Sequence, residues 1–171
     1  TLIINKAIKL NNMETKYKAK HICIEPYRNP WLENLKDVQI IRQQVEKSSI
    51  NWRKDLQRND LLFIDSSHII RPQGDVLFEY LEIIPELSKG VFVHVHDIFT
   101  PYDYPNEWIR KNIFLWNEQY LLEVLLSNFT RYEIIASLNL LKNKFYNNLK
   151  AVCPYLQKNH IPGSIYFRIK K

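Results

Sequence analysis

The sequence predicts an α/β fold, a three-layer sandwich built on a mainly parallel sheet. Short apolar runs recur along the 171 residues, and several of them stop on an acidic residue. The clearest runs are 60–65 and 90–97, which end at Asp65 and Asp97. Segments with a helical spacing of apolar residues separate the runs. This alternation is expected for buried parallel strands that are joined by crossover helices.

Each element follows from its local pattern. The apolar runs predict strands at 21–25, 38–45, 61–65, 91–96, 132–136 and 163–169. Helical spacing, capping residues and early prolines predict helices at 2–13, 29–35, 48–56, 72–87, 117–128 and 139–149. We expect the last two strands to pair antiparallel, with 163–169 as an antiparallel C-terminal edge strand. Nothing in the pattern argues for a second domain, so residues 1–171 are predicted to form one.

A long loop is expected at 98–116, where aromatic residues and prolines gather around a short helix at 107–111. Ordered loops that follow strands often cover a substrate site. Four aromatic residues of this loop either line a pocket for a substrate or form ordinary core, and the sequence leaves both readings open: Tyr102, Tyr104, Trp108 and Trp116.

Composition excludes several classes of protein. No apolar run approaches the ~20 residues of a membrane-spanning helix, and no signal peptide is recognisable, so a cytoplasmic location is expected. Cys23 and Cys153 are too few for a disulfide framework, which fits a reducing compartment. The net charge is +6, but the basic residues are scattered and match no nucleic-acid motif. Nucleic acid is therefore not the expected partner, and an anionic substrate or cofactor accounts for the positive charge equally well.

The order of elements resembles the class I S-adenosylmethionine-dependent methyltransferases. In this order a strand ending in Glu25 precedes strands ending in Asp65 and Asp97, then an aromatic loop and a late pair of strands. The resemblance covers essentially all of residues 1–171 and implies a Rossmann-like fold. Within the superfamily, Ile64-Asp65-Ser66-Ser67-His68 and His94-Val95-His96-Asp97-Ile98 resemble the branch of cephalosporin-hydroxylase-like and macrolide-sugar O-methyltransferases.

The first strand of this family and its glycine loop are not recognisable in the sequence. The chain has three glycines, Gly74, Gly90 and Gly163, and no two of them form a Gly-x-Gly loop. Average usage of about 7% would give roughly a dozen. Residues 1–4 resemble the beginning of the helix that follows the glycine loop. By this resemblance we expect the chain to lack the N-terminal strand and the loop.

The resemblance also implies a binding site for S-adenosylmethionine. Glu25 would hold the two ribose hydroxyls, because a carboxylate can accept hydrogen bonds from both. Gln44 would lie near the adenine, and Asp65 and Ser66 would belong to the same site. For Glu25 and Gln44 the alternative is an ordinary polar strand end.

Catalytic and metal-binding roles are implied for the two later strand ends. Asp65 and Asp97 would bind a divalent cation, and His68, with Asp65, would be catalytic, His68 acting as the base. Oxygen ligands suit Mg²⁺, but His96 stands where the branch often has an acidic residue, and an imidazole ligand favours Zn²⁺, Mn²⁺ or Fe²⁺. His94 alternates with His96 on one face of the strand, and one of the two is expected to be structural.

The predicted function is therefore S-adenosylmethionine-dependent methyl transfer to a hydroxyl of a sugar or another polar small molecule, assisted by Mg²⁺ or another divalent cation. Two other classes stay open. One is a non-catalytic α/β module that binds nucleotides or nucleic acid, and the other is a metal-dependent α/β enzyme that uses the same strand-end acids. The expected partner is the small-molecule acceptor, with no membrane partner, and self-association is left open.

Overall fold

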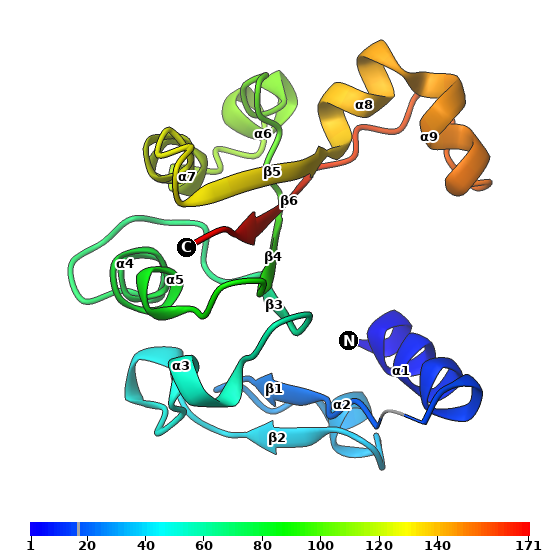
Figure 1. Ribbon diagram of the computed structural model, residues 1–171. Coiled ribbons are helices and arrows are strands. Elements are labelled where there is room, and N and C mark those ends of the chain that lie inside the picture. The colour runs from blue at the N-terminus through cyan, green and yellow to red at the C-terminus, as the bar shows by residue number, and fades with distance from the viewer. Residues whose placement is uncertain (17) are drawn as a thin grey trace. The chain divides into compact units, whose positions relative to one another are not determined.

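The computed structural model describes residues 1–16 and 18–171 and confirms the predicted mixed α/β, Rossmann-like class (Figure 1). The chain divides into two compact units, Thr1–Ser49 and Ile50–Lys171, called here the N-terminal and C-terminal units. In the part of the chain that the structure describes, no helix is both long and apolar enough to cross a membrane. That residues 1–171 act as one domain stays a prediction.

The N-terminal unit contains α1 (Leu2–Glu14), β1 (Ile22–Ile24), α2 (Pro30–Glu33), β2 (Gln39–Ile41) and a 3₁₀ turn (Val45–Lys47). β1 and β2 pair in parallel, with Cys23 opposite Ile40. β2 is shorter than the predicted strand, because the chain turns after it and the Lys47 amide donates to the Gln44 carbonyl, 3.0 Å away. Among the described residues, the one apolar side chain buried in this unit is Leu32.

The C-terminal unit is built on a four-stranded sheet in the order β3-β4-β6-β5, with β3 at Leu61–Ile64, β4 at Phe92–His96, β5 at Tyr132–Ser137 and β6 at Ser164–Ile169. β3 and β4 are parallel, and β6 runs antiparallel to both of its neighbours. The predicted antiparallel pair of β5 and β6 is therefore confirmed. β6 lies one position inside the sheet, and β5 forms its end.

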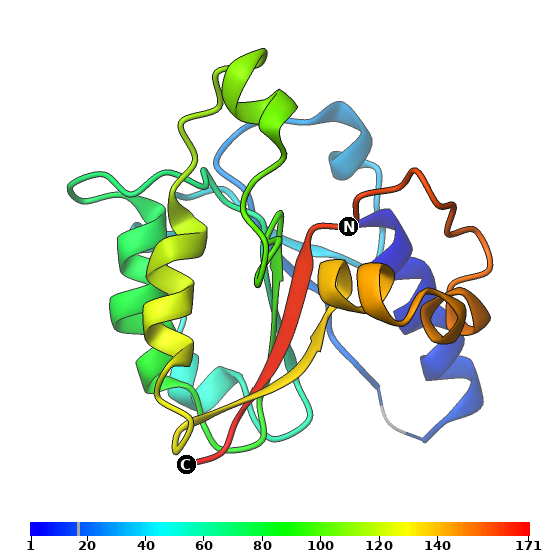
Figure 2. The same ribbon diagram turned by 90° about the horizontal axis from the view of Figure 1, so that it is seen from above.

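Helices cover both faces of this sheet. One face carries α7 (Glu118–Leu126) beside a continuous helical segment formed by α4 (Asp75–Phe78), a π-helical turn (Glu79–Ile83) and α5 (Ile84–Glu86). On the other side lies α8 (Leu138–Lys144), which packs against β5 and β6 and is followed by α9 (Tyr146–Val152) (Figure 2). The remaining short helices are α3 (Trp52–Asp55) and α6 (Asn106–Arg110).

Two helices differ from the prediction in an instructive way. The helix predicted at 72–87 contains the π turn, in which the Ile84 amide donates to the Glu79 carbonyl. Pro85 follows directly and has no amide to continue the regular ladder, which favours a widened turn. The helix predicted at 139–149 is split into α8 and α9 at Phe145, whose φ of −136° and ψ of 43° leave the helical region.

The core of the C-terminal unit lies against β4 and β6. Val93 and Val95 on β4, and Phe167 on β6, are at most 1% exposed. Successive side chains of a strand point to opposite faces, so the buried valines place His94 and His96 together on the other face. Because β3 and β4 are parallel neighbours, the residues that follow them, Asp65 and Asp97, come to the same edge of the sheet.

Candidate functional site

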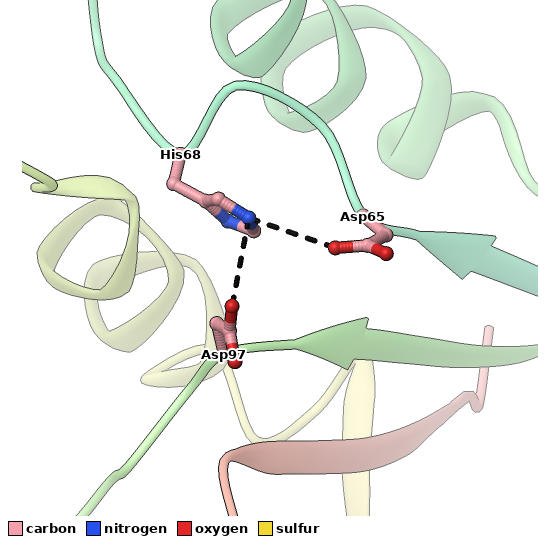
Figure 3. Close-up of side chains that lie close together, drawn as sticks. All are labelled: Asp65, His68 and Asp97. Carbon is pink, nitrogen blue, oxygen red and sulfur yellow. Dashed lines mark ion pairs between the residues drawn. The ribbon is translucent and has the colours of Figure 1, made fainter. Parts of the chain in front are cut away.

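The carboxyl ends of β3 and β4 carry a cluster of Asp65, His68 and Asp97 (Figure 3). His68 Nε2 lies 3.6 Å from Asp65 Oδ1 and 3.9 Å from Asp97 Oδ2. One ligand atom from each residue lies within 4.8 Å of the others. His68 and Asp97 have positive φ angles, 60° and 55°, which are uncommon for residues other than glycine and concentrate at functional sites.

Gly163, the residue before β6, contacts the backbone of Asp97. The Asp97 amide donates to the Gly163 carbonyl, 2.8 Å away. A Cβ atom at position 163 would lie 2.7 Å from Phe99 Cζ and 3.2 Å from Asp97 Cα. Glycine is therefore the residue that permits this close approach, and its absence would displace the backbone that carries Asp97.

A buried carboxylate lies on the other side of the His68 ring. Glu118, the first residue of α7, is 0% exposed. Its Oε2 lies 2.7 Å from His68 Nδ1, and its Oε1 accepts a hydrogen bond of 2.7 Å from the Tyr80 hydroxyl. His68 therefore has an acidic group at each ring nitrogen: Glu118 at Nδ1, and Asp65 with Asp97 at Nε2.

These charges shift the protonation of His68 and Asp65. Burial lowers the pKa of His68, but its contacts with Asp65 and Glu118, together with the charges of Glu118 and Asp97, outweigh this and raise the pKa to about 9. The contacts with His68 and His96 hold the pKa of Asp65 well below its usual range. His68 therefore keeps its proton at neutral pH, and Asp65 keeps its negative charge.

The two histidines of β4 have different environments although they share a face. His96 Nδ1 lies 3.4 Å from Asp65 Oδ1 and 3.2 Å from Asp97 Oδ1, and these two carboxylates raise the pKa of His96 to about 10. His94 instead stacks on Tyr166, with ring centroids 4.0 Å apart, and contacts the Ser164 hydroxyl at 3.0 Å. Burial lowers the pKa of His94 to about 4. His94 is thus held by side chains of β6, and the expectation that one of the two histidines is structural stays a prediction.

The loop after β3 is anchored to the first turns of the helical segment beside it. The Ser66 hydroxyl donates to Glu79 Oε2 at 2.8 Å, and the Ser67 amide and hydroxyl both donate to Asp75. Burial raises the pKa of Glu79 to about 8. Ser66, predicted to bind the cofactor, thus has its hydroxyl directed to a buried carboxyl group in this structure.

The aromatic loop reaches the cluster through Trp116, whose ring centroid lies 4.3 Å from that of His68. Trp116 stacks on Phe114 at 4.8 Å and meets Trp108 edge-on at 5.1 Å. Tyr104 is buried and its hydroxyl accepts a hydrogen bond from the Gln119 amide, whereas Tyr102 is partly exposed. Of the four predicted aromatic residues, Trp116 is the one in ring contact with His68.

Glu25 and Gln44 lie in the N-terminal unit. The Glu25 carboxylate accepts a hydrogen bond of 2.8 Å from the Tyr27 amide, which braces the turn after β1. Gln44 is exposed and precedes the 3₁₀ turn. Their roles in binding a cofactor stay predictions.

Three residues of the cluster's surroundings were missed from the sequence: Glu118, Tyr80 and Glu79. Glu118 lies at the start of the helix predicted at 117–128, and Tyr80 lies within the helix predicted at 72–87. Fifty positions separate Glu118 from His68 in the sequence, so no local spacing connects the two. The only signal available in the sequence was an acidic residue two positions after the aromatic loop.

The cluster fits a divalent cation. Asp65 and Asp97 offer carboxylate oxygens, and the imidazole of His68 lies within reach of the same point. His96 Nδ1 is buried and has no hydrogen-bond partner, although it lies beside both carboxylates. A mixed set of oxygen and imidazole ligands suits Mn²⁺, Fe²⁺ or Zn²⁺ as well as Mg²⁺. The predicted ligand set of Asp65, His96 and Asp97 stays a prediction, and the structure groups His68 with the two carboxylates.

The comparison with protein families agrees with this architecture. A family model described as a methyltransferase domain matches residues 1–98, which is more than half of the chain and includes Asp65, His68 and Asp97. The chain therefore belongs to the methyltransferase-domain family, and the match supports a class I S-adenosylmethionine-dependent methyltransferase. No curated protein and no solved structure matches the chain at a significant level.

Proposed function

We propose that this methyltransferase domain transfers a methyl group from S-adenosylmethionine to a hydroxyl of a sugar or another polar small molecule, with help from a divalent cation. The observation that carries the proposal is the grouping of Asp65, His68 and Asp97 at the carboxyl ends of β3 and β4. In open α/β sheets, ligands bind at the carboxyl ends of the strands. The finer resemblance to macrolide-sugar O-methyltransferases supplies the acceptor class.

The cluster offers the two groups that O-methylation needs. Asp65 and Asp97 would hold the cation, which when bound lowers the pKa of an acceptor hydroxyl. His68 Nε2 would take the proton of that hydroxyl once the bound cation has displaced the proton that the neighbouring carboxylates hold on the imidazole, because Nε2 faces the same space as Asp65 and Asp97. As the O–H bond breaks, the oxygen forms a bond to the methyl carbon and the carbon–sulfur bond breaks, which leaves S-adenosylhomocysteine.

Binding of the cofactor is proposed for a second group of residues. Glu25 would accept hydrogen bonds from the ribose hydroxyls, and its carboxylate keeps one oxygen beyond the one that braces Tyr27. Gln44 would lie near the adenine. Ser66 would contribute through its place directly after Asp65, since its hydroxyl already donates to Glu79.

We also propose that the active protein includes a further strand with a glycine loop. Within the C-terminal unit, β3 pairs with β4 on one side, and its other edge has no strand partner among the described residues. A buried parallel strand normally has neighbours on both sides, and an open edge invites pairing. This sequence has no Gly-x-Gly loop to approach a cofactor closely.

The proposal is tested by calorimetric titration of S-adenosylmethionine, with Mg²⁺ or Mn²⁺ and then with a chelator. Residues 1–171 and a chain extended upstream by the expected strand are titrated side by side. Binding followed by methyl transfer to sugars supports the proposal. Turnover should disappear in Asp65→Ala/Asp97→Ala while the circular dichroism spectrum is retained.

Each other outcome favours one rival. Binding that is lost with the chelator assigns the cation a role in organising the cluster. An extended chain that binds no S-adenosylmethionine in either buffer would overturn the proposal and favour a non-catalytic module. Hydrolytic or oxidative turnover with metal alone would favour the metal-dependent enzyme instead.

A further inference from the structure

We propose that Glu118 is a positioning residue that holds His68 with its proton on Nδ1 and directs Nε2 toward Asp65 and Asp97, and that Tyr80 holds Glu118 in place. The assignment deepens the proposed function and rests on it for its effect on turnover. The hydrogen-bonded arrangement itself can be tested without any activity.

The direction of the hydrogen bonds follows from the chemistry of the groups. An ionised carboxylate only accepts hydrogen bonds, so the 2.7 Å contact between Glu118 Oε2 and His68 Nδ1 requires the hydrogen on Nδ1. The Tyr80 hydroxyl donates to Oε1, which occupies the second oxygen. In the neutral ring Nε2 is then the acceptor, and it faces Asp65 and Asp97. Either proposed use of Nε2, as base or as metal ligand, needs this tautomer.

The burial of Glu118 makes its contact with His68 energetically important. Glu118 is 0% exposed, and a buried carboxylate is costly unless it is paired and hydrogen-bonded. Among the described residues, His68 is its only cationic partner. Its side chain makes no bond to the amides of α7, so it does not serve as a helix cap. The carboxylate is therefore directed at the imidazole.

The backbone at the start of α7 also holds His68. The Asn117 and Glu118 amides lie 3.0 and 3.3 Å from the His68 carbonyl and donate to it. The Asn117 side chain accepts from the Ile70 amide at 2.6 Å. With the ring of Trp116 against the imidazole, three consecutive residues, 116–118, fix both the backbone and the ring of His68. Positioning to this degree is typical of groups whose orientation matters for chemistry.

Tyr80 completes the arrangement from the π-helical turn. It is 0% exposed, and burial keeps its pKa well above the usual value, so the hydroxyl remains a donor. Glu79 and Tyr80 are the first two residues of the π-helical turn, and Glu79 is hydrogen-bonded to Ser66 and Tyr80 to Glu118. π turns inside helices occur frequently at functional sites.

The first measurement is nuclear magnetic resonance of the native protein with ¹⁵N-labelled histidine. We expect a strongly deshielded, slowly exchanging proton on His68 Nδ1, and at alkaline pH a neutral ring with its proton on Nδ1. Glu118→Gln should remove the deshielded proton. The matched control is Glu123→Gln, the same change at an exposed position of the same helix, which should retain it.

The second measurement is methyl transfer. Glu118→Gln should lower kcat about ten- to a hundredfold and leave KM for S-adenosylmethionine unchanged, as removal of a supporting hydrogen bond to an active histidine typically does. Tyr80→Phe should lower kcat by less. A neutral His68 ring protonated on Nε2, or no bonded Nδ1 proton in the native protein, overturns the assignment even where Glu118→Gln fails to fold. If the native chain transfers no methyl group, the proposed function fails while the resonance result still decides the position of the proton.

Discussion

The N-terminal and C-terminal units each place an acidic residue directly after a parallel strand. In the N-terminal unit Glu25 follows β1 and braces the neighbouring turn through the Tyr27 amide. In the C-terminal unit Asp65 follows β3 and meets His68 and His96. The same sequence signal therefore leads to a local turn in one unit and to a charged cluster in the other.

The difference follows from the packing behind each strand end. The partners of Asp65 arrive from β4 and, through His68, from α7, and these elements are held together by a core that includes Val93, Val95 and Phe167. The N-terminal unit has Leu32 as its buried apolar side chain among the described residues. A network of distant charged groups needs a rigid core behind it, whereas a single acid at a turn does not.

The largest expected effect is on His68. We expect His68→Gln, which keeps a donor for Glu118, to lower kcat of methyl transfer about a hundred- to ten-thousandfold, because the proton acceptor is lost. Turnover is measured with saturating S-adenosylmethionine, and folding is checked by circular dichroism. Undiminished turnover would show that His68 takes no part in the reaction. The difference between the strand ends at Asp65 and Glu25 would then have no functional consequence.

The second effect is on stability. Phe167 is 0% exposed and meets Tyr132 edge-on at 5.8 Å, so Phe167→Ala should cost about 3–5 kcal/mol of unfolding free energy. Leu32→Ala should cost about 2 kcal/mol, the low end for such a change, because the short α2 can relax around the cavity. Both are measured by urea unfolding. Equal losses would show that the N-terminal unit has a core as rigid as that of the C-terminal unit.

A third effect separates binding from chemistry. Glu25→Gln should raise KM for S-adenosylmethionine about tenfold, since a hydrogen bond to a charged group contributes about 1.5 kcal/mol or more, and should leave kcat nearly unchanged. Steady-state kinetics decides between the two parameters. A fall in kcat with constant KM would assign Glu25 to the chemical step. Glu25 and Asp65 would then no longer differ in having a binding role and a catalytic role.

The smallest effect is on the pH dependence of stability. The folded-state pKa of His96 is raised to about 10 from its usual 6.5, so its pairing with Asp65 and Asp97 stabilises the protein fully below pH 6.5 and is lost as the pH rises toward 10. In the presence of a chelator, Tm should therefore fall more steeply over this range in the native protein than in His96→Gln.

His96 is half-exposed, so its pairing with Asp65 and Asp97 contributes less than about 1 kcal/mol to the free energy of unfolding. Between pH 6.5 and 10, the fall in Tm of the native protein should therefore exceed that of His96→Gln by about 2 °C. His160→Gln, at an exposed loop position, serves as the control and should retain the native slope. Parallel slopes for His96→Gln and the native protein would mean that His96 is unpaired in solution.

Much of the fold could be predicted because local sequence patterns indicate where the strands and helices lie. The runs that end at Asp65 and Asp97 predicted the two parallel strands β3 and β4 nearly to the residue, and their parallel pairing brought both acids to one edge. The π turn was not predicted, because it depends on how Pro85 is accommodated once its helix packs on the sheet. The same holds for the break at Phe145.

The site was predictable only where its residues lie next to strands. Asp65, His68 and Asp97 follow strands closely, so a reading of strand ends found them. Glu118 and Tyr80 reach His68 from separate helices, and only the packing of α7 beside the helical segment brings them together. The distinct environments of His94 and His96 also depend on tertiary partners, since strand alternation treats the two alike.

The close approach at Gly163 limits how this protein can be redesigned. The connection between α9 and β6 is an obvious place to insert or exchange residues in order to change which acceptor is used. Its last residue nevertheless touches the backbone of Asp97 and the ring of Phe99, with no room for even one carbon atom more. An engineer who grafts a new loop there must keep the glycine, or the graft will displace Asp97, a residue of the proposed cation site that lies outside the loop.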